Sequence, residues 1–110
     1  MNIKAKVWLT LDEKPLIGKG GYLLLKKIYE KGSLRAAAEE LGVSYSFAWK
    51  YIQRIERVLG ERIVITERGG EFRGGSHLTD EGVRLLRLYE KAAKSIEEMI
   101  KTLENEGFSF

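Results

Sequence analysis

Apolar and polar residues alternate at the start of the chain. Apolar side chains occupy every second position over residues 3–11, and Trp8 lies among the polar ones. A period of two is typical of a β-strand with one buried face. Residues 12–15 include Asp and the only proline of the chain, which favours a turn, and the apolar pair at 16–17 predicts a short return strand. We therefore expect an N-terminal β-hairpin over residues 1–17.

The period then changes to that of an amphipathic helix. Apolar residues three and four positions apart predict a helix over residues 22–31. Ser33 is a favourable N-cap for the next helix, which Gly42 ends because glycine readily adopts a left-handed conformation. Ser44 is expected to cap a third helix over residues 45–59. The inward-facing residues expected in this third helix, spaced four, three and four positions apart, are Ala48, Ile52, Ile55 and Leu59.

Residues 33–59 have the spacing of a helix–turn–helix. Two short helices are joined by a tight turn, with small Ala38 where the helices cross and Val43 at the junction. This arrangement is typical of DNA-binding proteins, in which the N-terminal turns of the second helix enter the major groove. An ordinary helical corner has a similar pattern; the DNA-binding interpretation is the one we favour.

Side chains of these two helices supply the groups that DNA recognition needs. Lys50 and Arg54 are long enough to reach guanine edges or phosphates, and Phe47 has a ring suited to a thymine methyl group. The start of the first helix suits a phosphate. The alternatives are a solvated face for the charged residues and a core position for Tyr45. The expected DNA-binding residues are Ser33, Arg35, Ser44, Tyr45, Ser46, Phe47, Lys50 and Arg54.

A glycine-rich stretch, RGGEFRGGSHLT, follows a β-branched run at residues 62–66. A nucleotide-binding P-loop needs a lysine where this stretch has Gly75, so the side chain that reaches the phosphates is missing. The competing interpretation is a wing over residues 62–78, two antiparallel strands with a basic tip. Arg68 and Arg73 at this tip are expected to enter the minor groove or to bind phosphates. A plain hairpin loop is the remaining alternative.

The last part of the chain predicts one long helix over residues 79–105. Thr79 is its expected N-cap, and Asp80 and Glu81 favour the positive end of the helix dipole. Apolar residues three and four positions apart form a seam that packs either on the same domain or on a second copy. We favour a homodimer, because so small a domain can hardly cover so long a helix. The expected dimer-interface residues are Leu86, Tyr89, Ala93, Ile96, Ile100 and Leu103.

The 110 residues suit a single domain, 1–110, that is mainly α with small β-hairpins. The net charge of +3 is compatible with a polyanionic partner. The chain has no cysteine and no metal-ligand spacing, so we expect no metal and no cofactor. The absence of a nucleophile–base pair argues against an enzyme. No segment reaches the ~18 apolar residues of a membrane helix, and we expect a cytoplasmic protein with no membrane partner.

Residues 33–82 strongly resemble the DNA-binding domain of the ModE-type molybdate-responsive transcriptional regulators. That family has a serine-led helix with paired alanines, the motif LG-x-SY-x-x-AW-x-x-I, a double-glycine loop and LT-x-x-G. LysR-type regulators share the helix–turn–helix and LT-x-x-G but typically lack the SY-x-x-AW pair and the double-glycine loop. The N-terminal hairpin is also similar, so the resemblance covers residues 1 to about 105. The matching residues are Ser33, Ala36–Ala37, Leu41–Gly42, Ser44–Tyr45, Ala48–Trp49, Ile52, Gly69–Gly70, Gly74–Gly75, Leu78–Thr79 and Gly82.

The resemblance implies a winged helix–turn–helix that dimerises through its terminal helices and binds double-stranded DNA at a palindromic operator. Many relatives have a basic residue directly after SY, where this chain has Ser46 and Phe47, so its base preference is expected to differ. Molybdate-sensing relatives carry C-terminal oxyanion-binding domains. No part of this chain resembles a molybdate pocket, so direct binding of molybdate or tungstate is not expected. The alternatives are a winged-helix protein-interaction module and a truncated LysR-like regulator.

Overall fold

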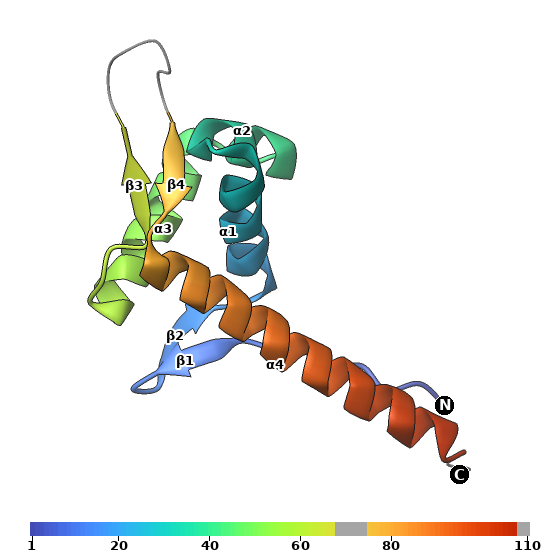
Figure 1. Ribbon diagram of the computed structural model, residues 1–110. Helices are drawn as coiled ribbons and strands as arrows, with labels where there is room; N and C mark the ends of the chain where they lie inside the picture. Colours follow the sequence, from blue (N-terminus) through green and yellow to red (C-terminus); the bar gives the residue numbers. More distant parts are fainter. Residues whose placement is uncertain (68–74, 108–110) are drawn as a thin grey trace.

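The computed structural model describes residues 1–67 and 75–107, which form four helices and two β-hairpins (Figure 1). The elements in chain order are β1 (Leu9–Leu11), β2 (Lys14–Ile17), α1 (Lys19–Lys31), α2 (Leu34–Leu41), α3 (Tyr45–Leu59), β3 (Val64–Thr66), β4 (Ser76–Leu78) and α4 (Asp80–Asn105). Helices α1–α3 and the β3–β4 hairpin form a compact body, from which α4 extends as a long rod (Figure 1). The expected fold class, mainly α with small β-hairpins, is confirmed. Helix α1 begins at Lys19, earlier than the predicted Tyr22.

The hydrophobic core lies between the first three helices, the base of the β3–β4 hairpin and the first turns of α4. Ile28 from α1 and Ile52 and Ile55 from α3 have no exposed area. Burial of an aliphatic side chain of this size contributes about 1.5–3 kcal/mol, which is what holds such short helices together. Ile17 at the end of β2 reaches the same core, so the N-terminal hairpin is attached to the compact body.

The helix caps predicted from the sequence are confirmed. The Ser33 Oγ accepts a hydrogen bond from the Ala36 N–H (3.1 Å), and the Ser44 Oγ accepts one from the Phe47 N–H (3.0 Å). Each bond satisfies a backbone donor that a first helical turn leaves without an intrahelical partner. Gly42 has a φ of 72°, the left-handed conformation that glycine adopts without steric cost. This conformation allows the tight turn between α2 and α3.

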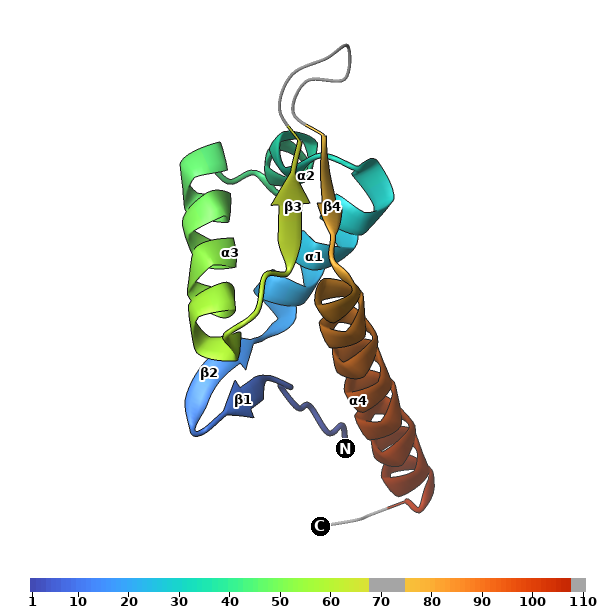
Figure 2. The ribbon, with the colours of Figure 1, turned by 60° about the vertical axis from the view of Figure 1, so that its left-hand side comes forward.

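The N-terminal strand is shorter than the alternating pattern predicted. We expected a strand over residues 3–11, but β1 contains only Leu9–Leu11, because the facing strand β2 is itself only four residues long. The residues before β1 run beside α4 (Figure 2), where the Ile3 N–H donates to Glu104 Oε2 (2.8 Å). The alternating segment is therefore paired in a sheet only at its end, and its beginning is bonded to α4 instead.

The LT-x-x-G motif joins the β3–β4 hairpin to α4. The Thr79 hydroxyl caps α4 by accepting from the Gly82 N–H (3.1 Å) and donates to the Arg62 carbonyl (2.7 Å). The Thr79 N–H donates to the Ile63 carbonyl (3.0 Å). Glu56 of α3 completes the joint, because its Oε2 accepts from the Ile63 N–H (2.8 Å). The base of the hairpin is thus bonded both to the end of α3 and to the start of α4.

Helix α4 has nearly the predicted bounds, but part of its predicted dimer seam faces its own domain. Leu86 is only 1% exposed and Tyr89 is also buried. Tyr89 stacks on Tyr22 of α1, with ring centroids 4.8 Å apart, and its hydroxyl donates to the Val7 carbonyl (3.0 Å). These two residues are therefore core residues and do not lie on a free surface. The four other predicted seam residues, all partly exposed, are Ala93, Ile96, Ile100 and Leu103.

Candidate nucleic-acid interface

The N-terminal half of α3 presents its polar face to solvent. Ala48 and Ile52 on the opposite face are buried in the core and hold the helix in place. Although Phe47 and Tyr45 are aromatic, they are 57% and 39% exposed, respectively. Lys50 lies one turn further along the helix and is also exposed. This end of α3 therefore offers a partner both apolar rings and hydrogen-bond donors.

Three segments meet at this end of the molecule. Figure 2 shows the N-terminal end of α3, helix α2 and the open ends of β3 and β4 on the same side. The Arg35 guanidinium lies 4.7 Å from the ring centroid of Tyr45, which connects the start of α2 to the start of α3. Ser33 and Ser44 serve as helix caps, but a hydroxyl that accepts one hydrogen bond still has a proton to donate. Both serines therefore remain able to donate to a phosphate.

The outermost stripe of α3 differs from the predicted one. Ser46, Lys50, Gln53 and Arg57 are spaced four, three and four residues apart, and all four are exposed. Gln53 is absent from the predicted set of DNA-binding residues. A glutamine side chain can bond to the two major-groove groups of adenine. The sequence could have placed Gln53 on the same exposed face as Lys50, because it follows Lys50 by three residues and helical neighbours on one face are three or four residues apart.

The Arg54 side chain, predicted to contact DNA, is bonded to strand β2 of the N-terminal hairpin. Its Nη1 donates to the Pro15 carbonyl (2.8 Å) and its Nη2 to the Leu16 carbonyl (3.3 Å), both in β2. The guanidinium also lies over the ring of Tyr51, 4.8 Å from its centroid. We expected Arg54 on the DNA-binding face, but in the structure it fastens the N-terminal hairpin to α3. Sequence spacing does not reveal this, because a step of four residues from Lys50 is equally compatible with the exposed face.

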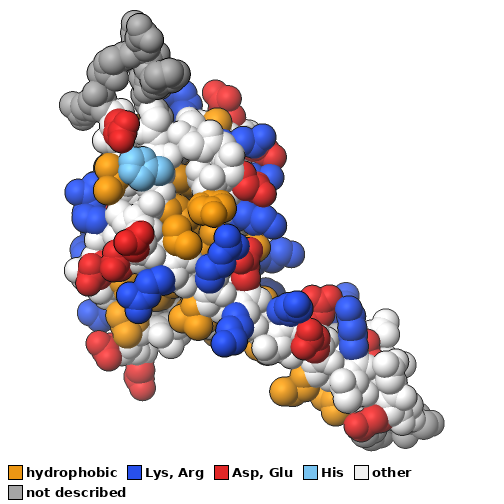
Figure 3. Space-filling model, viewed as in Figure 1, with side chains coloured by type: hydrophobic (Ala, Val, Ile, Leu, Met, Phe, Trp, Pro, Cys, Tyr) orange, Lys and Arg blue, Asp and Glu red, His pale blue; other side chains and the backbone are white. Residues whose placement is uncertain are grey.

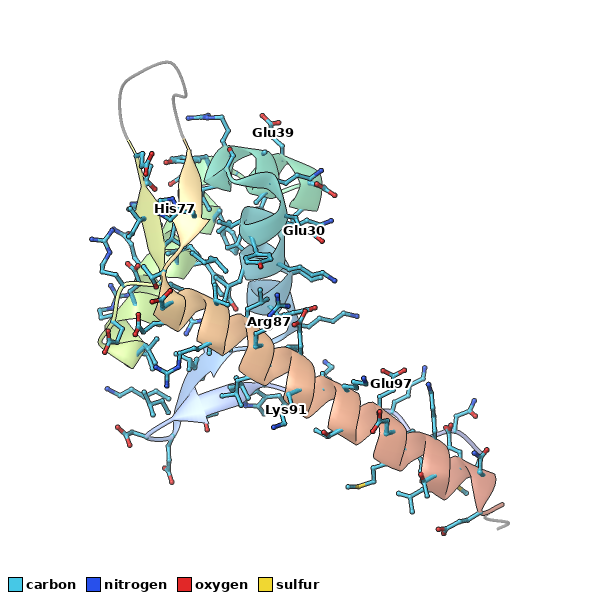
Figure 4. The ribbon with its side chains drawn as sticks, in the orientation of Figure 1. Glu30, Glu39, His77, Arg87, Lys91 and Glu97 are labelled. Carbon is cyan, nitrogen blue, oxygen red and sulfur yellow. The ribbon has the colours of Figure 1, made fainter. Side chains whose placement is uncertain are left out.

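Strands β3 and β4 form an antiparallel hairpin, the stem of the predicted wing. Ile65 pairs with His77, and both side chains are exposed. Figure 4 shows His77 on β4, one of the two strands of the wing stem. Arg68 and Arg73, which we predicted at the wing tip, lie outside the described residues.

Several charged side chains away from α3 form ion pairs within the chain. Figure 3 shows basic and acidic side chains mixed over α1 and α4. Lys27 Nζ lies 2.8 Å from the Glu40 carboxylate, and this hydrogen bond lowers the pKa of Glu40. Arg87 Nη1 donates to Glu90 Oε1 (2.8 Å), which lowers the pKa of Glu90. Carboxylates of the same chain engage these cations, whereas Lys50 lies on the exposed face of α3.

Residues 1–67 and 75–107 contain no group of three His, Asp or Glu side chains able to hold a metal ion. None of the helices in this described part of the chain is both long and apolar enough to cross a membrane.

Comparison with known families agrees with this geometry. The model of the bacterial regulatory helix-turn-helix proteins, lysR family, matches residues 22–83. This chain belongs to that family. The lysR-family match begins within α1 and ends in the first turn of α4, so it contains α2, α3 and the β3–β4 hairpin.

The curated proteins that are similar in sequence to this lysR-family chain include ModE regulators. The transcriptional regulator ModE of Yersinia pestis is 36% identical over 107 residues, which cover 96% of this chain and 41% of the relative. The DNA-binding transcriptional dual regulator ModE of Escherichia coli K12 is 33% identical over 94 residues, which cover 84% of this chain and 36% of the relative. The resemblance to ModE-type regulators is thereby confirmed. The chain spans about two fifths of the length of these relatives.

Solved DNA-binding domains share the fold of this lysR-family chain. The BenM DNA-binding domain in complex with benA site 1 DNA superimposes with a TM-score of 0.58 at 21% identity, over 78% of this chain and 94% of that one. The CbnR DNA-binding domain in complex with DNA gives a TM-score of 0.60 at 22% identity, over 79% and 94%. At these identities the likeness concerns the fold alone, and it confirms the winged helix–turn–helix architecture.

Proposed function

We propose that this chain acts as a dimeric, sequence-specific DNA-binding transcriptional regulator of the ModE type. The observation that carries the proposal is the exposed N-terminal half of α3, which lies at the same end of the molecule as α2 and the wing stem (Figure 2). A helix that is anchored by its apolar face and exposes polar and basic groups suits the major groove, which is about 12 Å wide. The description of the E. coli relative as a DNA-binding regulator supports the same function.

Base reading is proposed for the exposed stripe of α3. Lys50 at the centre of the stripe can donate to guanine, and Gln53 on the next turn can pair with adenine. Ser46 precedes Lys50 by one turn and can bond to either base. Phe47 beside them is the apolar group suited to a thymine methyl. We therefore propose that each half-site is read by these four residues, without Arg54.

Phosphate contacts are proposed on both sides of this stripe. Arg35 and Tyr45 are in contact at the junction of α2 and α3, and Ser44 caps α3 at the same place. Contacts to the DNA backbone position a protein but do not read sequence. Arg68 and Arg73 are proposed to supply such contacts, or minor-groove contacts, from the wing tip.

Dimerisation is proposed through a stripe of α4 that borders the predicted seam. Leu88 and Met99 are 55% and 62% exposed, and Ala92 and Ser95 lie between them at steps of four, three and four residues. The stripe has large residues at both ends and small residues in the middle. Two antiparallel copies of α4 can therefore bring Leu88 of one chain to Met99 of the other and approach closely at the centre, in a twofold contact.

A twofold dimer presents two α3 helices related by the same axis, so its operator is palindromic, with half-site centres about 34 Å apart.

Selection from a pool of random DNA duplexes tests the proposal. We expect recovery of a palindrome and gel retardation of the selected duplex that weakens steeply with added salt. An unrelated duplex of equal length is the control. No retardation of any duplex at low salt would reject the proposal and favour a protein-interaction module.

A further inference from the structure

Arg54 is the point at which the N-terminal hairpin is fastened to α3. Its two terminal nitrogens donate to consecutive carbonyls of β2, those of Pro15 and Leu16. The same guanidinium stacks on Tyr51. The ring of Tyr51 lies against Gly21 in the first turn of α1, so closely that a Cβ atom on that glycine would be 2.7 Å from Tyr51 Cε1. The middle of α3 is thus held to β2 by hydrogen bonds and to α1 by a ring contact.

The other side of the N-terminal hairpin is attached to α4. The Val7 carbonyl, just before β1, accepts from the Tyr89 hydroxyl (3.0 Å). Further toward the N-terminus, the Ile3 N–H donates to Glu104 near the end of α4 (2.8 Å). Figure 2 shows the β1–β2 hairpin between the C-terminal end of α3 and helix α4. The hairpin therefore bridges the helix proposed to read DNA and the helix proposed to form the dimer.

We infer that Arg54 is a positioning residue that sets the orientation of α3 relative to α4, and thereby the half-site spacing that the dimer accepts. The inference rests on the proposed function. In a dimer joined through α4, the distance between the two α3 helices depends on how each α3 is held on its own α4. Loss of the guanidinium removes the two hydrogen bonds between α3 and β2 but leaves the buried face of α3, including Ile52 and Ile55, in the core.

The test compares wild type and Arg54→Gln on duplexes that carry two copies of the selected half-site, with spacers varied by one base pair at a time. Wild type is expected to bind the duplex with one spacer length more tightly than the others. Arg54→Gln is expected to lower the ratio of these affinities about tenfold. The salt dependence of affinity is expected to stay unchanged, because no phosphate contact is removed. Lys91→Gln is the control: it removes one positive charge from the exposed surface of α4, outside the exposed stripe of α3, and should keep the wild-type spacer preference.

An unchanged spacer preference in Arg54→Gln overturns the inference. A salt slope smaller by about 0.9 with the same preferred spacer also overturns it, because that change marks the loss of one direct phosphate contact. Circular dichroism establishes that each variant is folded at the temperature used. If Arg54→Gln does not fold, the same spacer series is measured with Arg54→Lys. Lysine keeps the charge but lacks the two guanidinium nitrogens that bond to two carbonyls at once, so it should lose the spacer preference in the same way. If wild type binds no duplex, the proposed function fails first and the inference falls with it.

Discussion

The carbonyl oxygen of Ile63 lies so close to Gly82 that a Cβ atom at position 82 would overlap it. The same carbonyl accepts the Thr79 N–H (3.0 Å), so it is held in place by the backbone that precedes α4. Glu56 holds the Ile63 N–H on the other side (2.8 Å). The close approach of two backbone segments therefore requires glycine in the LT-x-x-G motif, and it fixes the wing stem against α4.

Gly82→Ala is expected to lower the free energy of unfolding by about 1–3 kcal/mol, because the added methyl group must displace a bonded carbonyl. Urea denaturation measures this change. Gly20→Ala is the matched control: Gly20 also lies in a first helical turn, and a Cβ atom there meets nothing within 4 Å. The control should be neutral or stabilising by up to about 1 kcal/mol, the helix preference for alanine over glycine. Equal effects of both substitutions would contradict the steric explanation.

Glu90 is expected to stabilise the fold at neutral pH but not in acid. The hydrogen bond from Arg87 lowers the pKa of Glu90 from its ordinary 4.5, so folding favours the charged carboxylate. This contribution is present above pH 4.5 and is lost as the pH falls through the lower pKa of the folded state. Glu90→Gln should therefore be less stable than wild type at neutral pH, and the difference should shrink on acidification. Denaturation curves on both sides of pH 4.5 measure it.

Glu98→Gln is the control for this pH dependence, because Glu98 is an exposed carboxylate on the same helix. Its stability should follow that of wild type at every pH. A difference between wild type and Glu90→Gln that stays constant from neutral to acid pH would show that the ion pair with Arg87 does not contribute through its charge.

Lys50→Ala is expected to lower specific DNA affinity by about 1–3 kcal/mol if Lys50 contacts a base, and by less if it contacts only a phosphate. Titration of the selected duplex by fluorescence anisotropy measures the loss. Lys91→Ala removes the same charge from the exposed surface of α4 (Figure 4) and should bind nearly as well as wild type. The same affinity for Lys50→Ala and wild type would remove Lys50 from the proposed interface.

Leu88→Lys and Met99→Lys are each expected to weaken dimerisation at least about tenfold, because they place a charge in the apolar stripe of α4. Both side chains are exposed in the single chain, so folding should be preserved. Analytical ultracentrifugation over a range of protein concentrations measures the dimer dissociation constant. Ile65→Lys, which places the same charge on an exposed apolar position of β3, should dimerise as wild type does. If the three variants behave alike, the interface lies elsewhere.

Local features of the chain were predictable from the sequence, because each depends on residues a few positions apart. The serine caps of α2 and α3, the left-handed Gly42 and the bounds of α3 follow from hydrogen bonds within one turn. The family resemblance also lies in such motifs. The winged helix–turn–helix, and with it the exposed end of α3, could therefore be expected before the structure was known.

Tertiary packing decided the remaining features, because they depend on contacts between residues far apart in the chain. Arg54 bonds to carbonyls 39 and 38 residues away, which turns an expected DNA contact into a joint with the N-terminal hairpin. Tyr89 reaches the Val7 carbonyl 82 residues away, which places part of the expected dimer seam in the core. Helical periodicity shows that these side chains share a face with their neighbours. Which side of a helix faces the core is decided by the elements that pack against it.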